Sequence, residues 1–538
     1  MASTLTVAGD LAGAPRVEDW VRRSAERHQA KEALRIGARR VSYAELMGTA
    51  DRWARVLRTA HPHGEPRSIG LLSDRTLTGY TGVLATLCAG ARVCPLGPDL
   101  PSDRLVALLR DHPLDALITD HVCAGQLKSL ADRYALPPIL APDNDSAFWV
   151  GTQARVLVDR DSTTAQGARD RPSETAYVMF TSGSTGRPKA VPITHANVLS
   201  FLTTVRDRYD FTASDVFSQT FGLTFDLAYF DLFVAWTCGG TLVHTHPAAL
   251  GRLEEFVRRE SLTVWFSVPS AIGFARRTSG LPSNSLSSLR WSLFCGEALL
   301  TEDAAAWQRA AANSVVENLY GPTEVTIACS AYRWSPESRG AGLHGVVPVG
   351  HLFPGHDAVL LDEAGRIDVS QGELCVTGPQ MFSGYLREED DEGRFVRIDD
   401  RLWYRTGDLV RRSETAGLLY LGRVDHQVKI RGHRIDPGEI EYWLRTIPGV
   451  EAAAVLADGG PEDRELVAFC SGPAVDTAQL DRRLREFLPP HMIPRRYVTL
   501  DRLPVTDRGK TDRSALAAVL TRSHEVLGLS PGLPAPGR

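Results

Sequence analysis

The sequence lacks the patterns typical of zinc-binding, disulfide-rich, secreted and membrane-spanning proteins. Its 8 cysteines form no CxxC pair and no His/Cys ligand spacing, so neither a structural zinc site nor a disulfide framework is expected. The chain does not begin with a basic stretch followed by an apolar core. Its most hydrophobic long stretch, residues 217–243, contains Asp226 and Asp231. We therefore expect no secretory signal, no membrane span and a cytoplasmic location.

The chain also lacks an excess of charge of one sign. Lys and Arg number 60 against 65 Asp and Glu, which gives a formal net charge of −5 and no basic surface for nucleic acid or an anionic membrane. Hydrophobic residues make up 43% and charged residues 23%, an ordinary globular balance. Because 538 residues exceed one ordinary core, several domains are expected.

Strand-like and helix-like apolar runs alternate along most of the chain. Residues 68–72 and 116–119 have the pattern of strands, and residues 77–90 have that of a helix. This alternation predicts an α/β fold with parallel-rich sheets covered by helices, followed by a β-rich portion over residues 347–421. A Gly-Arg-Val-Asp sequence then marks a hinge before a small α+β unit. The expected division is a disordered N-terminus (1–15), an N-terminal core (16–422), a hinge (423–425), a mobile C-terminal lid (426–522) and a disordered tail (523–538).

The most informative stretch runs from Tyr177 to Lys189 and joins a strand-like segment to a loop rich in hydroxyls and glycines. Glycines allow backbone N–H groups to approach phosphate oxygens, and Ser and Thr hydroxyls add donors. Lys189 supplies a compact positive charge, although it follows a proline and the loop therefore differs from a Walker loop. The pattern predicts a loop that grips a polyphosphate.

Three further motifs carry groups suited to nucleotide chemistry. Residues 318–324 (Asn-Leu-Tyr-Gly-Pro-Thr-Glu) combine a ring for stacking, an amide for a base edge and Glu324, a hard oxygen donor for Mg²⁺. In residues 404–409 and 420–423, Asp408 can accept hydrogen bonds from ribose hydroxyls and Arg423 can reinforce them. Lys510 lies on a polar loop near the C-terminus that could carry its charge into a site.

Together the four motifs resemble those of the adenylate-forming superfamily: acyl-CoA synthetases, luciferase and the adenylation domains of non-ribosomal peptide synthetases. The resemblance extends from about Val17 to Leu520. GELCVTGPQMFSGYL (Gly372 to Leu386) and GRVDHQVKIRGHRIDPGEIE (Gly422 to Glu441) resemble amino-acid-activating members. The chain looks most similar to stand-alone enzymes that load carrier proteins, such as D-alanine–carrier protein ligase and the alanine-loading enzymes of polyketide pathways.

The resemblance implies two half-reactions at one site. A substrate carboxylate attacks the α-phosphate of ATP and expels pyrophosphate, and a thiol then attacks the acyl-adenylate and expels AMP. It implies a lid that rotates about the hinge residue Asp425, catalytic roles for Lys510 and Glu324, Mg²⁺ on Glu324 and a path for the thiol past Gly432. The residues it implies for nucleotide binding are Thr181, Ser182, Gly183, Ser184, Thr185, Gly186, Lys189, Asn318, Leu319, Tyr320, Gly321, Pro322, Thr323, Asp408, Tyr420, Arg423 and Lys510.

Asp226 lies in an apolar run and would be costly to bury without a partner, which a substrate ammonium group would supply. Amino-acid-activating relatives bind the α-ammonium group at this position, while Asp231 is the competitor and looks structural. The remaining lining is mostly apolar and favours a small side chain, with alanine first, then glycine or serine. The resemblance implies a substrate pocket of Asp226, Leu227, Phe230, Ser270, Leu293, Cys295, Gly296, Leu319, Ile327, Ala328 and Lys510.

The sequence contains no carrier segment, so we expect a separate carrier protein that bears phosphopantetheine, in antibiotic or other natural-product biosynthesis. The sequence does not decide the oligomeric state, which could be a monomer or a weak dimer. Three alternatives remain open: an acyl-CoA or aryl-acid ligase, a non-catalytic nucleotide-binding protein, and a kinase or GTPase suggested by the Gly-rich loop alone. Asp226 argues against the first, and the intact Lys189, Glu324, Asp408 and Lys510 argue against the second.

Overall fold

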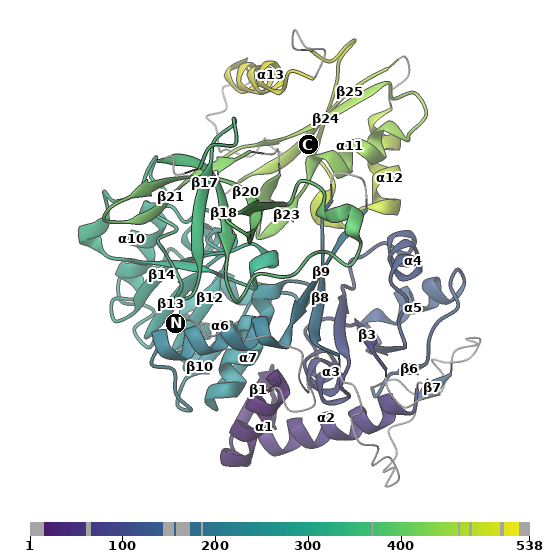
Figure 1. The fold of residues 1–538 in the computed structure, drawn as a ribbon, viewed down its shortest axis with the longest axis vertical. Coiled ribbons are helices and arrows are strands. Elements are labelled where there is room, and N and C mark those ends of the chain that lie inside the picture. Colours follow the sequence, from purple (N-terminus) through teal and green to yellow (C-terminus); the bar gives the residue numbers. More distant parts are fainter. Residues whose placement is uncertain are drawn as a thin grey trace.

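The structure, a computed structural model, describes residues 15–60, 66–143, 155–157, 173–183, 187–367, 370–424, 427–460, 463–472, 476–505 and 511–526. Most of the two terminal segments expected to be disordered lies outside these residues. So do Ser184, Thr185 and Gly186 of the phosphate loop, the expected hinge residue Asp425, and Lys510. Figure 1 shows a large body that carries the lid at the top of the view.

The first sheet of the core has seven strands in the order β7-β6-β5-β3-β4-β8-β9. All neighbours run parallel except β8 and β9, which form an antiparallel pair with Thr181 opposite Lys189. The phosphate loop is therefore a hairpin connection, and Lys189 begins a strand that the sequence did not predict. The strands are β3 (Ser68–Leu72), β4 (Arg92–Leu96), β5 (Ala116–Thr119), β6 (Ile139–Leu140), β7 (Val156–Leu157), β8 (Thr175–Thr181) and β9 (Lys189–Thr194).

The second sheet has nine strands in the order β16-β15-β14-β13-β12-β10-β11-β1-β2. Its central strands are parallel, as the alternation of strands and helices predicted. Strand β14 ends at Tyr320, inside the second sequence motif. The strands are β1 (Glu32–Ile36), β2 (Arg39–Ser42), β10 (Val216–Gln219), β11 (Thr241–His244), β12 (Val264–Ser267), β13 (Trp291–Phe294), β14 (Val315–Tyr320), β15 (Ser330–Trp334) and β16 (His351–Leu352).

Helices cover these sheets, and two of them are enclosed on every side. Helix α3 is buried from Thr78 to Cys88, and α7 is buried from Asp226 to Trp236, as expected for helices that pack between layers. Thr194 caps α6 through the backbone N–H of Asn197, as predicted. The core helices are α1 (Val17–Arg27), α2 (Tyr43–Arg58), α3 (Leu77–Cys88), α4 (Ser102–Asp111), α5 (Ala124–Ala131), α6 (His195–Arg208), α7 (Asp226–Cys238), α8 (Leu253–Glu260), α9 (Ser270–Thr278) and α10 (Thr301–Ala310).

The expected β-rich portion is a five-stranded antiparallel sheet in which β20 pairs with β18, β19 and β21. Asp408 lies in β20 opposite Arg423 in β21, so strand pairing brings these two sequence-distant residues together. The strands are β17 (Asp357–Leu361), β18 (Gln371–Thr377), β19 (Phe395–Ile398), β20 (Arg401–Ser413) and β21 (Gly417–Arg423).

The lid contains a two-stranded hairpin, β22–β23, and a three-stranded sheet in the order β24-β25-β26 with its own hydrophobic cluster. It meets the core where Glu439 of α11 forms an ion pair with Arg104 of α4. Helix α13 continues to Val526, so residues 523–526 are helical. The expected start of the disordered tail at residue 523 is therefore too early in the chain. The elements are β22 (Val428–Ile430), β23 (His433–Ile435), α11 (Pro437–Arg445), β24 (Ala452–Asp458), β25 (Glu465–Ser471), α12 (Thr477–Phe487), β26 (Arg496–Thr499) and α13 (Arg513–Val526).

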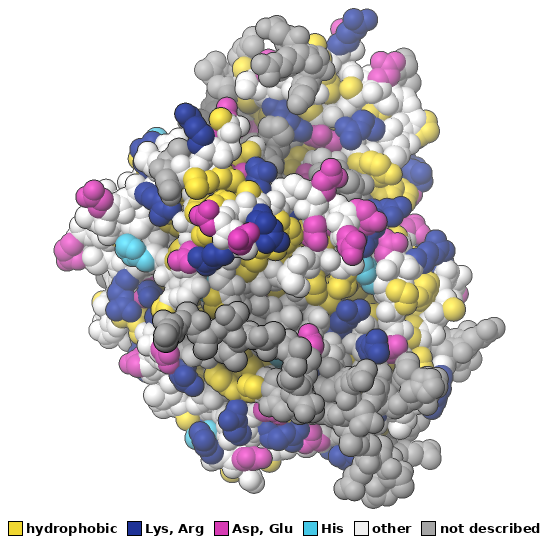
Figure 2. Space-filling view, in the orientation of Figure 1, with side chains coloured by type: hydrophobic (Ala, Val, Ile, Leu, Met, Phe, Trp, Pro, Cys, Tyr) yellow, Lys and Arg dark blue, Asp and Glu magenta, His cyan; other side chains and the backbone are white. Residues whose placement is uncertain are grey.

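The described surface shows no dominant charge on the face in view. Figure 2 shows basic and acidic side chains interspersed over the core and the lid. Among the described residues, none of the helices combines the length and the apolar character needed to cross a bilayer.

Candidate active site

Two neighbouring cavities lie where the lid meets the core. We call the first the Asp226 cavity, and its volume is about 670 Å³. Three of the four sequence motifs contribute to its lining, and the fourth, which contains Lys510, does not. The second, which we call the Asn318 cavity, has a volume of about 570 Å³. Both are lined by Gly296, Gly321, Arg423 and Lys429, so the two cavities share a wall. The motifs that the sequence analysis singled out therefore meet in one region.

Asp226 is the first residue of α7 and faces the Asp226 cavity. Burial raises the pKa of its carboxyl to about 6, and the Thr323 side chain and nearby backbone N–H groups oppose this effect. Leu227, Cys295 and Gly296 lie on the same cavity wall. The site thus presents one buried carboxylate in mostly apolar surroundings, an arrangement that suits a cationic ligand group.

The other residues expected in the substrate pocket divide into two sets. Ser270 and Leu319 line the Asn318 cavity. Phe230, Leu293, Ile327 and Ala328 are buried and line neither cavity, so their place in the substrate pocket stays a prediction. Asp231 is also buried away from both cavities, and burial raises its pKa well above the usual range, which favours an uncharged acid.

The connection between β14 and β15 carries Thr323 and Glu324 and has a strained backbone directly after them. Thr326 and Ile327 have φ angles of 55° and 70°, which are unfavourable for β-branched residues. The buried Gln380 amide stabilises this turn because its Nε2 donates to the carbonyls of Thr326 and Ala328, while its own backbone carbonyl accepts from the Thr326 hydroxyl. Strain maintained by surrounding contacts is typical of a functional site.

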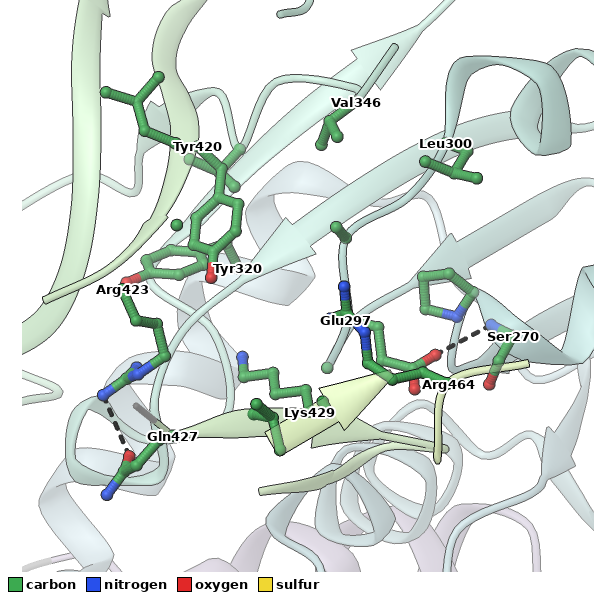
Figure 3. Close-up of a pocket in the computed structure, with 18 of the residues that line it drawn as sticks. Ser270, Glu297, Leu300, Tyr320, Val346, Tyr420, Arg423, Gln427, Lys429 and Arg464 are labelled. Carbon is green, nitrogen blue, oxygen red and sulfur yellow. Dashed lines mark hydrogen bonds between the residues drawn. The ribbon is translucent and has the colours of Figure 1, made fainter. Parts of the chain in front are cut away.

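Two of the residues expected to bind nucleotide, Tyr320 and Arg423, contact Asp408. Its carboxylate accepts hydrogen bonds from the Tyr320 hydroxyl at 2.6 Å and from the Arg423 guanidinium at 2.7 Å. Tyr320, Tyr420 and Arg423 line one end of the Asn318 cavity (Figure 3). The Tyr320 hydroxyl is thus held by Asp408, and base stacking by its ring stays a prediction.

Asn318 adds an acceptor to the Asn318 cavity. Its Nδ2 donates to the carbonyl of Pro348 at 2.9 Å, which orients the amide. Its Oδ1 is buried and has no hydrogen-bond partner among the described residues. A buried acceptor without a partner is costly, and the exocyclic amino group of an adenine would satisfy it.

Glu324 is the carboxylate expected to bind Mg²⁺. Burial alone would raise its pKa, but the Arg434 guanidinium and the Tyr385 hydroxyl lower it to about 2. Arg434 approaches to 3.0 Å and Tyr385 donates at 2.7 Å. The described residues contain no cluster of three or more His, Cys, Asp or Glu side chains that could hold a metal. A single ionised carboxylate fits Mg²⁺, which is commonly bound by one or two carboxylates together with substrate phosphates.

The phosphate loop is in contact with the lid. The Ser182 hydroxyl donates to the backbone carbonyl of Arg434 at 2.8 Å, and the backbone N–H of Gly183 stabilises the charged form of Glu439. Lys189 does not line the Asp226 cavity. Its amino group donates to the carbonyl of Asp390 at 2.9 Å and lies over the Tyr385 ring. The expected contact of Lys189 with phosphate therefore stays a prediction.

Sequence reasoning missed the contribution of the β22–β23 hairpin. This hairpin brings Lys429 to both cavities and Arg434 to Glu324, and the backbone N–H of Gly432 at its turn donates to Glu297 at 2.8 Å. A Cβ atom on Gly432 would lie 2.6 Å from Val268, so the turn approaches the core closely. The motif from Gly422 to Glu441 was visible in the sequence, but nothing in its pattern shows where the hairpin docks.

Comparison with known proteins identifies related sequences and structures. Residues 21–386 match the AMP-binding enzyme family, and residues 439–510 match the AMP-binding enzyme C-terminal domain. The chain is 34% identical to phosphinothricin tripeptide synthetase PhsC of Streptomyces viridochromogenes over 95% of its length, but it spans only 46% of that relative. It is 32% identical to an L-proline–[L-prolyl-carrier protein] ligase of Streptomyces coelicolor, over 93% of this chain and 96% of the ligase.

A solved structure extends the comparison to the arrangement of the fold. The adenylation domain AlmE of Vibrio cholerae, crystallised with glycyl-adenosine-5′-phosphate, superposes with a TM-score of 0.84 at 28% identity. The superposition covers 97% of this chain and 100% of AlmE. The expected α/β class with a C-terminal domain is therefore confirmed.

Proposed function

The chain belongs to the AMP-binding enzyme family, and on that basis we propose that it activates a small amino acid with ATP and transfers it to a carrier protein. Alanine is the favoured substrate, followed by glycine and serine. The observation that carries the proposal is the buried carboxylate of Asp226 on a cavity wall adjoining the nucleotide motifs. The fatty or aryl acid that an acyl-CoA or aryl-acid ligase activates offers no ammonium group to that carboxylate.

In the first step, an oxygen of the amino acid carboxylate bonds to the α-phosphorus of ATP, and the bond to pyrophosphate breaks. The substrate ammonium pairs with Asp226, while Asn318 accepts from the adenine amino group and Asp408 accepts from the ribose. Mg²⁺, which Glu324 would hold together with the phosphates, supplies charge neutralisation when bound. Lys510, which lies outside the described residues, is proposed to bridge the two anions.

In the second step, the thiol of a phosphopantetheine arm attacks the acyl carbon, and the bond to AMP breaks. We propose a separate carrier protein as the thiol donor, in natural-product biosynthesis. The similarity to a relative named as a prolyl-carrier protein ligase, over almost its whole length, supports this partner. Leu227, Cys295 and Gly296, which lie on the same wall as Asp226, support a substrate side chain that is small and carries no charge.

The test is pyrophosphate exchange into ATP with all amino acids in both chiral forms, followed by loading of carrier proteins. Exchange stimulated by alanine, glycine or serine is expected. A preference for a large or charged amino acid would contradict the pocket assignment, and ADP as the product would indicate a kinase. AMP formation that depends on a fatty or aryl acid would instead favour the acyl-CoA or aryl-acid ligase.

The lid orientation described here suits the second step. Arg434 engages Glu324, and its backbone carbonyl engages Ser182, so lid groups already occupy two proposed contacts of the metal and phosphates. We propose that the lid leaves this orientation for adenylation and returns after pyrophosphate departs.

The Arg434→Ala variant tests the proposed lid orientation. Loss of this buried ion pair is expected to slow aminoacyl transfer at least about tenfold, because removing one partner of such a pair typically costs several kcal/mol. Pyrophosphate exchange is expected to change much less. Arg496→Ala, which removes an ion pair with Glu465 inside the lid, is the matched control. Equal loss of exchange and transfer in Arg434→Ala would count against the proposed orientation.

The pH dependence of amino acid use follows from Asp226. Since burial raises its pKa to about 6, the free site is protonated below that pH and loses its charge for the ammonium group. The kcat/KM for alanine is therefore expected to fall below about pH 6, approaching tenfold per pH unit, because kcat/KM reports groups of the free enzyme. Exchange assays from acid to neutral pH measure it, with the KM for ATP as the internal control. A flat alanine profile across this range would contradict the assignment.

A further inference from the structure

The Asn318 cavity extends from the proposed nucleotide site to residues of the lid sheet. Tyr320, Tyr420 and Arg423 lie at one end, whereas Ser270, Glu297 and Arg464 gather at the other (Figure 3). Val455, Leu456 and Ala457 of β24 add an apolar wall beside Arg464. The end farther from the nucleotide residues is therefore built from both domains, with an apolar side and a cation.

Arg464 differs from the other lid arginines near this cavity. It is exposed, and within the described part of the chain no ion pair or side-chain hydrogen bond is found for it. Arg513 on the same cavity pairs with Glu441, and Arg496 nearby in the lid sheet pairs with Glu465. The charge of Arg464 therefore remains for a ligand.

The neighbouring groups position Arg464 without consuming its charge. Asp463, directly before it, lies 3.9 Å from Arg277 of core helix α9, which links this part of the lid to the core. Glu297 lines the same cavity, but its oxygens accept from the backbone N–H groups of Ser270 and Gly432 at 3.0 and 2.8 Å. Glu297 thus fixes the hairpin turn against α9.

We propose that Arg464 binds the phosphodiester of the carrier's phosphopantetheine arm at the lid end of the Asn318 cavity. This inference rests on the proposed function. The phosphodiester is the only charged group of the arm, and a guanidinium can donate two parallel hydrogen bonds to it. The apolar wall of β24 contacts the pantetheine chain, and the thiol reaches the adenylate past Gly432. Arg464 is a positioning residue and takes no part in bond making or breaking.

The test compares two small acceptors, pantetheine and 4′-phosphopantetheine, in aminoacyl thioester formation. The wild-type protein is expected to use phosphopantetheine about five- to tenfold better in kcat/KM, a modest factor because Arg464 is exposed. Arg464→Ala is expected to remove this preference through KM, with unchanged kcat. Arg464→Lys should restore part of it.

Pyrophosphate exchange in the same variants separates this inference from the proposed function. Arg464→Ala should exchange like the wild type, which also shows that it is folded. Arg495→Ala, an exposed lid arginine that lines neither cavity, is the matched control and should keep the preference for phosphopantetheine. The inference is overturned if the wild type uses both acceptors equally, or if Arg464→Ala weakens both to the same extent. Absence of exchange with every amino acid would instead overturn the proposed function.

Discussion

Asp226→Asn is expected to lower alanine-dependent pyrophosphate exchange by about 10²–10³-fold, because removing one partner of a buried charge pair typically costs about 3–5 kcal/mol. The asparagine keeps the shape of the side chain at the start of α7 but leaves the substrate ammonium without a counter-charge. The loss should appear mainly as a higher KM for alanine, with the KM for ATP nearly unchanged. Exchange kinetics at saturating ATP measure it.

Asp231→Asn is the matched control for this variant. Asp231 lies five residues further along α7, is also buried and lines neither cavity. Because burial favours its uncharged form, replacement by asparagine should leave the KM for alanine unchanged. If Asp226→Asn retained the wild-type KM for alanine, or if Asp231→Asn raised it as strongly, the proposed ammonium site would be wrong.

Lys510→Ala is expected to lower adenylation by at least about 10²–10³-fold, the usual cost of losing one donor that stabilises developing charge. Lys510 is the only group that we propose to bridge the attacking carboxylate and the α-phosphate, so its loss leaves the repulsion between these two anions uncompensated. Transfer of alanine from preformed alanyl-adenylate to the carrier should remain close to the wild-type rate, because the proposed lid rotation removes Lys510 before that step. Exchange and single-turnover transfer measure the two steps separately.

Arg508→Ala, in the same segment of the chain, controls for a general effect of altering that loop. It should leave both steps nearly unchanged. Exchange in Lys510→Ala within about threefold of the wild type would discard the role of this lysine, since a well-placed charge donor contributes far more. Equal loss in both steps would show that the lysine supports folding or nucleotide binding instead.

Local sequence patterns predict those elements whose stability depends on nearby residues. The strand Ser68–Leu72 and the capped start of α6 follow from apolar spacing and from a Thr side chain that binds its own helix. Strand β9 escaped prediction because its partner is β8 across a loop that looked purely phosphate-binding. Pairing of this kind depends on contacts that composition does not reveal.

Some residues of the candidate site can be predicted from the sequence, whereas others are revealed only by the fold. Asp226 is predictable because a charge in an apolar run needs a partner, and it does face the cavity. Phe230 and Leu293 are buried but line neither cavity, and whether an apolar side chain reaches a cavity depends on packing that the sequence pattern does not reveal. The contact of Arg434 with Glu324 joins the lid to the core across 110 residues, and only the folded arrangement reveals it.

The charge that Asp226 offers to a substrate amine is central to the proposed activity. Pyrophosphate exchange with alanine and with propionate, which has the same carbon skeleton without the amino group, tests that charge in one assay. We expect alanine to stimulate exchange strongly and propionate to leave it at background. Equal exchange with the two acids, or exchange with propionate alone, would contradict the account.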